Sequence, residues 1–277
     1  MIRTDYPLKK ITTIGLGGIC KEFFCPSQLN NINDFKAKKN KLFIGNGSNI
    51  CFVTDYYDGF IISLKKMNKN ISYDRDYIYC SSNISCTKIA RYLFQNKISG
   101  FEFLYGIPGT IGGAIYMNAG AFNEEILSYV HSIDALDPNG YLRTIYYKDL
   151  NYGYRFSGLD NKLLITSIVF RNHQKKFDHN LLEKLNSKRK LSQPINQLSC
   201  GCIFKNPKNN YASELIEKSD LKGTRVGGIY ISNKHSNYFI NDGSGTYNEF
   251  ITLLEIVKNK VLKKFNIKLE EEVILIK

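Results

Sequence analysis

A glycine-rich segment near the middle of this 277-residue chain limits its possible folds more than any other feature. Residues Gly106–Gly113 hold four glycines around Pro108. Main-chain N–H groups can converge on an anion in such a segment, because glycine has no side chain to block close approach. No Lys-Ser/Thr pair follows the glycines, which excludes an ATP-binding Walker loop. The segment is therefore either another kind of phosphate-binding loop or a rigid tight turn.

Two more glycine segments lie nearer the start of the chain. Gly15–Cys20 has Cys20 where a dinucleotide-binding Rossmann fingerprint needs its last glycine, and no clear strand precedes it. The usual dinucleotide interpretation therefore fails there. Gly45–Asn49 follows the apolar run 41–44, so its turn comes directly after a predicted strand. Together with Gly106–Gly113 it could clamp a pyrophosphate from two sides, although two unrelated tight turns explain the same residues.

Periodic apolar residues divide the chain into three zones, which we expect at residues 1–66, 67–175 and 190–277, with a charged helical link over 177–190. The predicted strands cover 41–44, 60–64, 77–81, 130–136, 141–147, 163–170 and 271–276. The predicted helices cover 87–97, 211–219 and 247–265, and the polar stretch 31–39 is a helix or a loop. Thr246 and Glu249 have the spacing of a capping box. Strands and helices alternate irregularly with hairpins, which favours an α+β fold over a doubly wound sheet.

Composition is that of an ordinary globular chain and excludes several classes of protein. The hydrophobic fraction is 43%, and no stretch approaches the roughly 20 apolar residues that span a bilayer. The first residues have no apolar core, so we expect no secretory signal and a cytoplasmic protein. The net charge is +13, but the lysines are spread along the chain and no basic run is interleaved with aromatics. We therefore expect no nucleic-acid binding.

Seven cysteines are scattered through the sequence, and their number is odd. Without a secretory context, disulfides are not expected. Cys200 and Cys202 form the one close pair, and no second Cys or His pair lies at zinc-finger spacing. The sequence therefore predicts no metal site.

Eight segments occur in an order and spacing that resemble the bacterial enolpyruvyl-sugar reductase family, in its compact type. They are Gly45–Asn49, Gly106–Ala121, Tyr154–Ser157, Arg189–Pro194, Gly201–Pro207, Leu221–Gly223, Lys234–His235 and Leu269–Val273. The resemblance implies a vanillyl-alcohol oxidase-like FAD-binding fold of two subdomains, followed by a C-terminal α/β substrate-binding domain. It also implies non-covalent FAD, NADPH as hydride donor, and reduction of the enolpyruvyl group of UDP-N-acetylglucosamine enolpyruvate by a monomer.

The same resemblance assigns residues to the cofactor and to the substrate. The residues implied for FAD are Gly45, Asn46, Gly47, Ser48, Asn49, Ile107, Pro108, Gly109, Thr110, Gly112, Gly113, Asn118, Ala119 and Gly120. The residues implied for the UDP-sugar are Arg189, Lys205, Asn206 and His235. His235 could equally be a packed surface histidine.

Three residues, Arg155, Cys202 and Glu272, match the family's catalytic positions. Hydride transfer to the enolpyruvyl double bond leaves negative charge beside a carboxylate, which needs a cation and a positioned acid. Without the resemblance, Arg155 would be interpreted as a surface arginine in a loop, and Glu272 as one of three adjacent solvated glutamates.

Cys202 departs from the family pattern, which usually has a proton-donating serine at this position. A thiol, with an ordinary pKa of about 8.5, is a stronger acid than a serine hydroxyl and stays mostly protonated at neutral pH. We therefore expect proton donation to survive the change. The alternative is that Cys202 is a small buried residue and the donor lies elsewhere.

Two rival interpretations remain, an oxidase with the same flavin fold and a basic nucleic-acid-binding protein without catalysis. Such oxidases often carry a histidine near the first glycine loop for covalent flavin attachment, and none of the chain's four histidines lies there. The second rival has only the diffuse positive charge in its favour.

Overall fold

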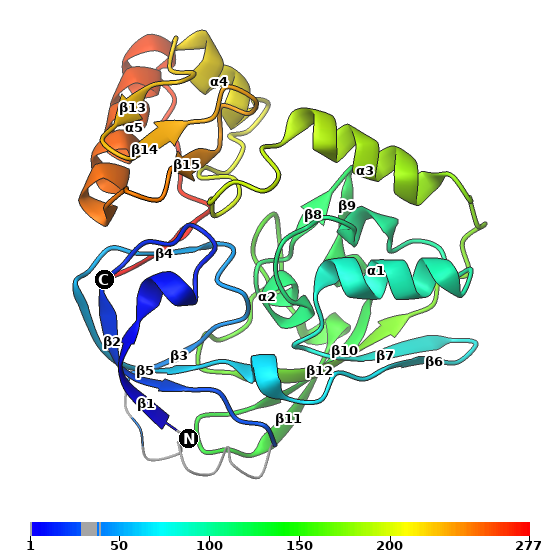
Figure 1. Ribbon diagram of the computed structural model, residues 1–277. Helices are drawn as coiled ribbons and strands as arrows, with labels where there is room; N and C mark the ends of the chain where they lie inside the picture. The colour runs from blue at the N-terminus through cyan, green and yellow to red at the C-terminus, as the bar shows by residue number, and fades with distance from the viewer. Residues whose placement is uncertain (1, 29–37, 39) are drawn as a thin grey trace. The chain divides into compact units, whose positions relative to one another are not determined.

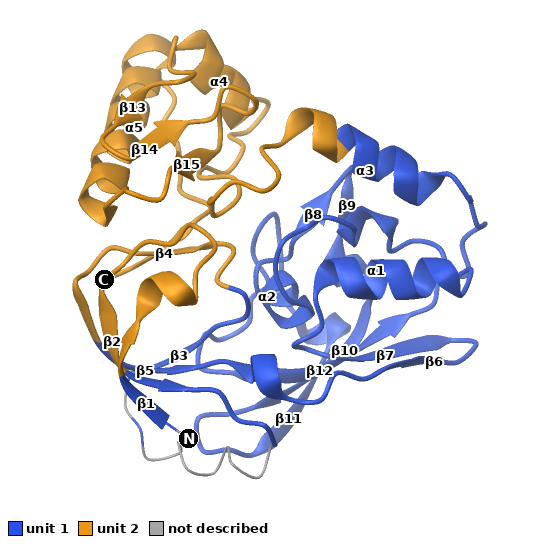
Figure 2. Cartoon of the chain, viewed as in Figure 1, with its two compact units in different colours: residues 1–4, 22–46, 58–188 blue, residues 5–21, 47–57, 189–277 orange. Residues whose placement is uncertain are grey.

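The computed structural model describes residues 2–28, 38 and 40–277 (Figure 1). They form two compact units, each built from separate stretches of chain (Figure 2). Unit 1 contains Met1–Thr4, Glu22–Asn46 and Asp58–Lys188, and unit 2 contains Asp5–Lys21, Gly47–Tyr57 and Arg189–Lys277. The predicted polar helix or loop over 31–39 lies outside the described residues, apart from Lys38. The three zones expected from the sequence divide the chain differently from these two units, and they stay a prediction.

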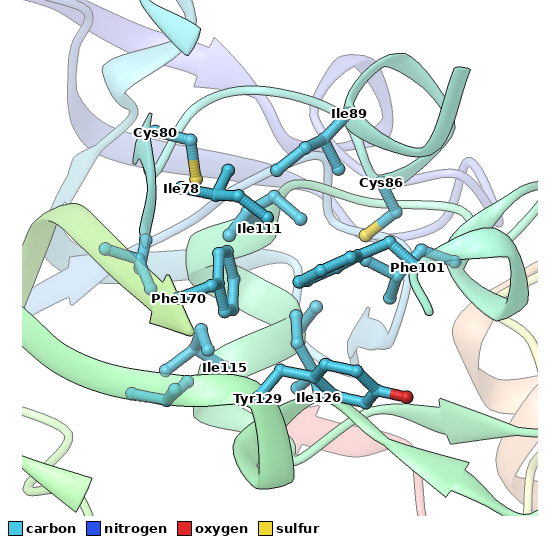
Figure 3. Close-up of a cluster of buried hydrophobic side chains, with 14 of the residues drawn as sticks. Ile78, Cys80, Cys86, Ile89, Phe101, Ile111, Ile115, Ile126, Tyr129 and Phe170 are labelled. Atoms are coloured by element: carbon cyan, nitrogen blue, oxygen red, sulfur yellow. The ribbon is translucent and has the colours of Figure 1, made fainter. Parts of the chain in front are cut away.

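The centre of unit 1 is a five-stranded antiparallel sheet with the strand order β11-β10-β12-β7-β6. Its strands are β6 (Ile71–Tyr73), β7 (Tyr77–Ser81), β10 (Val130–Leu136), β11 (Leu142–Tyr146) and β12 (Leu164–Arg171). Alternate residues of a strand point to the same face, and here they bury Ile78, Cys80, Ile168 and Phe170. Helices α1 (Cys86–Gln95) and α2 (Ile111–Tyr116) add Ile89, Ile111 and Ile115 to the same core (Figure 3). This core supports the central glycine segment, because α2 begins inside that segment and packs into the core.

A second sheet has the strand order β1-β2-β5-β3. Its strands are β1 (Ile2–Pro7), β2 (Ile19–Phe24), β3 (Lys41–Phe43) and β5 (Tyr56–Ile62). Strands β3 and β5 are parallel, and the next N–H, that of Ile44, still donates to the carbonyl of Ile62 at 2.9 Å. The turn that starts at Gly45 therefore leaves directly from the end of a paired strand.

Unit 2 contains a three-stranded antiparallel sheet, a parallel strand pair and two helices. They are β13 (Arg225–Val226), β14 (Ile229–Ile231), β15 (Phe239–Asn241), β4 (Ile50–Phe52), β16 (Ile274–Ile276), α4 (Ala212–Lys218) and α5 (Tyr247–Phe265). Helix α5 starts with the predicted capping box of Thr246 and Glu249 and ends at Phe265, followed by the C-cap Asn266, whose φ of 55° is left-handed. Its buried face, with Phe250 and Val257, packs into the core of the unit.

The remaining elements are short or cross the boundary between the units. They are β8 (Gly120–Ala121), β9 (Glu124–Glu125), the 3-10 helices η1 (Leu8–Lys10), η3 (Leu64–Lys66), η4 (Glu102–Leu104), η5 (Ile126–Tyr129) and η6 (Tyr147–Asp149), and helix α3 (Leu181–Ser192). The β8–β9 hairpin and the 3-10 helices connect larger elements.

The predicted mixed fold is confirmed, but several predicted boundaries differ, and two of these differences have a clear hydrogen-bond cause. Helix α3 begins at Leu181 rather than near 177, because the Asp178 carboxylate accepts the N–H of Asn180 at 2.9 Å and forms a turn first. The last strand is shorter than 271–276, because the N–H of Glu272 donates to the carbonyl of Ile203 at 2.8 Å instead of continuing the ladder.

Candidate active site

Two predicted cofactor segments meet inside unit 1 at Gly45 and Thr110. A Cβ added to Gly45 would lie 2.4 Å from the Thr110 hydroxyl, so no side chain fits there. Thr110 is buried and caps α2, where its hydroxyl accepts the N–H of Gly113 at 3.3 Å. The two glycine turns are therefore parts of one structure, as a shared phosphate-binding role requires.

The N–H groups of the central segment are mostly used by the protein itself. Ile111 donates to the Ile84 carbonyl and Gly112 to the Ser82 carbonyl, both at 2.8 Å. Gly113 donates to Thr110, and the first two residues of the segment bond to η4 and α1. Contacts to an anion therefore fall mainly to Gly109 and Thr110. The rim is open, because a Cβ added to Gly113 would meet only the Thr110 hydroxyl, at 3.6 Å, and this leaves room for a close-lying cofactor.

Asn49, in unit 2, holds the main chain of the predicted catalytic glutamate. The Asn49 amide donates to the carbonyl of Glu272 at 2.9 Å, and the Asn49 carbonyl accepts the N–H of Ile274 at 3.0 Å. Gly47 in the same turn has a φ of +62°, and an added Cβ would lie 2.1 Å from the carbonyl oxygen of Ile11. This half of the first glycine loop is thus built into unit 2 and fixes Glu272.

Main-chain hydrogen bonds bring Cys202 and Glu272 into one small structure. Cys202 forms an antiparallel bridge with Tyr238, and the next residue, Ile203, donates its N–H to the Asn237 carbonyl at 2.9 Å. On its other side Ile203 accepts the N–H of Glu272 at 2.8 Å. The segment that begins at Cys202 therefore lies between two others and is held on both sides.

Tyr238 is the common neighbour of the predicted catalytic and substrate residues of unit 2. Burial raises the pKa of its hydroxyl well above the ordinary value, the nearby Cys202 and Glu272 raise it further, and Arg189 opposes them. The hydroxyl also shares a hydrogen bond with the Cys202 thiol. Tyr238 was not predicted as a site residue, because no local sequence pattern marks a tyrosine that faces a cysteine 36 positions away.

Arg189 is an unusual buried cation. It is only 5% exposed, and its guanidinium donates to the Gln193 amide oxygen at 3.3 Å. Buried arginines are rare unless they are paired. Its position near Tyr238 fits a contact with an anionic ligand.

The other three predicted substrate residues have structural partners in unit 2. Lys205 lies 3.8 Å from the Glu270 carboxylate. Asn206 accepts the N–H of Ala212 at 3.1 Å, where α4 begins. The ring of His235 packs edge-on against Tyr238 at 4.8 Å, and burial lowers its pKa, which favours the neutral imidazole. These contacts leave their substrate roles as predictions.

Arg155 occupies the tip of a tight turn in unit 1. Gly153 and Phe156 exchange two main-chain hydrogen bonds, of 2.8 and 3.0 Å, and Arg155 has a left-handed φ of +55°. This conformation costs a side-chain-bearing residue about 1–2 kcal/mol. The guanidinium donates to the Gly120 carbonyl at 3.1 Å and lies 5.0 Å from the Tyr154 ring. Arg155 thus has a defined conformation and a defined partner, and its catalytic role stays a prediction.

Asn118, predicted to bind the cofactor, is fully buried and directs its amide to Glu125 and to the Gly153 carbonyl. Ala119 and Gly120 follow it, and the Ala119 carbonyl accepts the N–H of Ile126 at 2.9 Å. All seven cysteines are free thiols. In the described part of the chain, no group of three or more His, Cys, Asp or Glu side chains could hold a metal ion. No helix among the described residues is long and apolar enough to cross a membrane.

Known proteins match the chain over its whole length. The FAD binding domain model matches residues 31–146, and the model for the C-terminal domain of UDP-N-acetylenolpyruvoylglucosamine reductase matches residues 193–276. The chain is 34% identical to that reductase from Fusobacterium nucleatum over 280 residues, which cover 100% of this chain and 99% of the relative. It is 37% identical to the reductase from Chlamydia felis, with 99% and 94% covered.

A solved structure gives the same result. The crystal structure of the reductase from Thermus caldophilus matches with a TM-score of 0.84 and 25% identity, and covers 100% of both chains. These matches confirm the resemblance expected from the eight segments. The chain belongs to the UDP-N-acetylenolpyruvoylglucosamine reductase family.

Proposed function

We propose that Arg155, Cys202 and Glu272 act at the reacting atoms of the reaction that this family performs. In this chain the reaction is the NADPH-dependent, FAD-mediated reduction of the enolpyruvyl group of UDP-N-acetylglucosamine enolpyruvate to UDP-N-acetylmuramate, a step of peptidoglycan precursor synthesis. The observation that carries the proposal is the main-chain bonding that places Cys202 against Tyr238 and joins Glu272 to the next residue, Ile203, in unit 2.

The residues that would hold FAD are those of the joined glycine turns, among them Gly45, Gly109, Thr110 and Gly113. Bound there, FAD would supply hydride transfer from NADPH to the enolpyruvyl double bond. The open rim at Gly113 and the tight fit between Gly45 and Thr110 support this assignment. For Ser48 the assignment rests on the resemblance alone.

The protein's own contribution is to balance charge and to supply a proton. Arg155 carries the permanent positive charge that stabilises the anionic character developing beside the substrate carboxylate. Cys202 donates its proton to the carbon that receives no hydride, and a thiolate remains on the enzyme. The Tyr238 hydroxyl, hydrogen-bonded to that sulfur, stabilises the thiolate until a proton returns. Glu272, whose main-chain carbonyl accepts a hydrogen bond from the Asn49 amide, acts on the same enolpyruvyl group of the substrate.

Steady-state oxidation of NADPH tests the proposal. The purified protein should be yellow, release its flavin in acid, and oxidise NADPH only when UDP-N-acetylglucosamine enolpyruvate is present. Glu272→Gln should slow that turnover and still bind FAD, because the main-chain bonds of residue 272 remain. Full turnover in this variant would remove Glu272 from the reaction. A colourless protein with salt-sensitive DNA binding would favour the nucleic-acid alternative.

We also propose that the protein acts in the cytoplasm and as a monomer. Seven free thiols fit a reducing compartment. Fractionation of cells and the sedimentation mass of the purified holoenzyme test the two statements separately.

A further inference from the structure

We propose that Asn118 is a positioning residue that sets the place of Arg155, and that this is the main function of its side chain. The inference rests on the proposed role of Arg155 in the reaction. It concerns unit 1 alone and follows from three contacts of one buried amide.

The Asn118 side chain uses three of its four hydrogen-bonding positions inside the protein, including both donors. Both N–H groups of its amide donate, one to the Glu125 carboxylate and one to the Gly153 carbonyl, each at 2.9 Å. Its oxygen accepts the N–H of Leu127 at 3.3 Å. The residue is 0% exposed. An amide with both its donors and one acceptor position occupied has little left for a cofactor, whereas it joins three separate segments of the unit.

One of those segments is the turn that carries Arg155. The Gly153 carbonyl accepts both from Asn118 and from the N–H of Phe156, which closes the turn. A left-handed, side-chain-bearing residue such as Arg155 persists only where the surrounding structure determines its conformation. Asn118 supplies that support at the base of the turn.

The same short segment also holds the far end of the arginine. The guanidinium donates to the carbonyl of Gly120, two residues after Asn118. Gly120 is itself fixed, because it pairs with Glu125 in the β8–β9 hairpin, and a Cβ there would lie 2.3 Å from the Glu124 carbonyl oxygen. Residues 118–120 therefore contact the turn at its base through a side chain and at its tip through a carbonyl.

The two half-reactions separate positioning from cofactor binding. Asn118→Ala should slow reoxidation of the reduced flavin by the enolpyruvyl sugar by about tenfold or more, because a misplacement near 1 Å is enough for such a loss. Reduction of the flavin by NADPH and the affinity for FAD should change less than about threefold. A cofactor-binding side chain would instead give a large loss of FAD affinity, and that result would overturn the proposal.

A double-mutant cycle gives the decisive comparison. If Asn118 acts through Arg155, then adding Asn118→Ala to Arg155→Ala should slow reoxidation by less than about twofold further. Losses that multiply independently would overturn the proposal. Unimpaired reoxidation in Arg155→Ala alone would instead refute the proposed function, so the two failures can be told apart.

Asn83→Ala is the matched control for lost stability. Asn83 is also buried in unit 1, and its amide also donates to two acceptors, the carbonyls of Leu64 and Met67, at 2.9 and 2.8 Å. It should lower the melting temperature in a similar way and leave the ratio of the two half-reactions unchanged. If Asn118→Ala does not fold, Asn118→Ser, which keeps one donor, carries the same measurements. Equal ratios in the Asn83 and Asn118 variants would reduce Asn118 to a structural residue.

Discussion

The turn that carries Arg155 in unit 1 and the segment that carries Cys202 in unit 2 are held by different kinds of contact. The Arg155 turn is closed by two main-chain hydrogen bonds of its own, contains a residue with a strained φ, and is joined to the rest of unit 1 by the side-chain amide of Asn118. Main-chain hydrogen bonds hold the Cys202 segment on both sides, from Asn237 and from Glu272. Main-chain bonds survive most substitutions, whereas a side-chain support disappears with one. The geometry at Arg155 should therefore be the more easily changed by mutation.

Removal of the Arg155 cation should have a large effect on the reaction rate. Arg155→Ala should slow the reoxidation half-reaction by about 10²–10³-fold, the usual cost of losing one group that stabilises developing charge. The melting temperature should fall slightly, because alanine loses the contact to Gly120 and keeps the same strained φ. Stopped-flow flavin absorbance measures the rate. A loss below about tenfold would mean that the supported turn serves some other purpose.

A substitution that weakens the contacts of the Cys202 segment should mainly lower the stability of the fold. Asn237 is 2% exposed, and its amide exchanges two hydrogen bonds with the main chain of Phe204, of 2.9 and 2.8 Å. Asn237→Ala leaves both Phe204 groups unsatisfied, at about 1–3 kcal/mol for each such group. We expect a loss of about 2–6 kcal/mol in the free energy of unfolding. Urea denaturation measures it, with exposed Asn210→Ala as a control that should stay within about 0.5 kcal/mol.

Alkaline pH should have the smallest effect and should act on unit 2 through its buried thiols. Burial raises the pKa of Cys51 to about 12, and burial also raises the pKa of the neighbouring Cys200 well above its ordinary value. The pKa of a thiol in the unfolded chain is about 8.5. The folded state therefore holds the proton more tightly than the unfolded state does. This stabilisation is complete below about pH 8.5 and is lost as the pH rises toward the folded value. Cys51→Ala should flatten the decline of the urea midpoint between about pH 8 and 10, and an unchanged slope would contradict this origin.

Local patterns were enough to predict much of the fold. The hairpin of β10 and β11 and the capping box at Thr246 lie where turn and capping residues place them. Both depend on residues a few positions apart. The last strand starts at Ile274, later than predicted. This late start was missed, because it depends on a hydrogen bond from Glu272 to Ile203, which is far away in the sequence.

The site shows the same limit. The family, its cofactor and its activity were predicted correctly from ordered motifs, and the individual site residues remain predictions. The roles inferred for Asn118 and Asn49 come from partners 35 and 223 positions away. Their motif membership suggested contact with FAD, because a motif records that a residue is needed and not which atom it touches. Only the folded chain shows that their amides hold Gly153 and Glu272.

The two half-reactions of Cys202→Ala test the central claim most directly. NADPH should reduce the bound flavin of this variant at nearly the normal rate, because the thiol takes no part in that step. Reoxidation by the enolpyruvyl sugar should fall by about 10²–10⁴-fold, the usual contribution of a positioned acid. Cys202→Ser should restore much of it, since a hydroxyl can donate in the same place. Reoxidation of Cys202→Ala at the normal rate would contradict the account and place the proton donor on another residue.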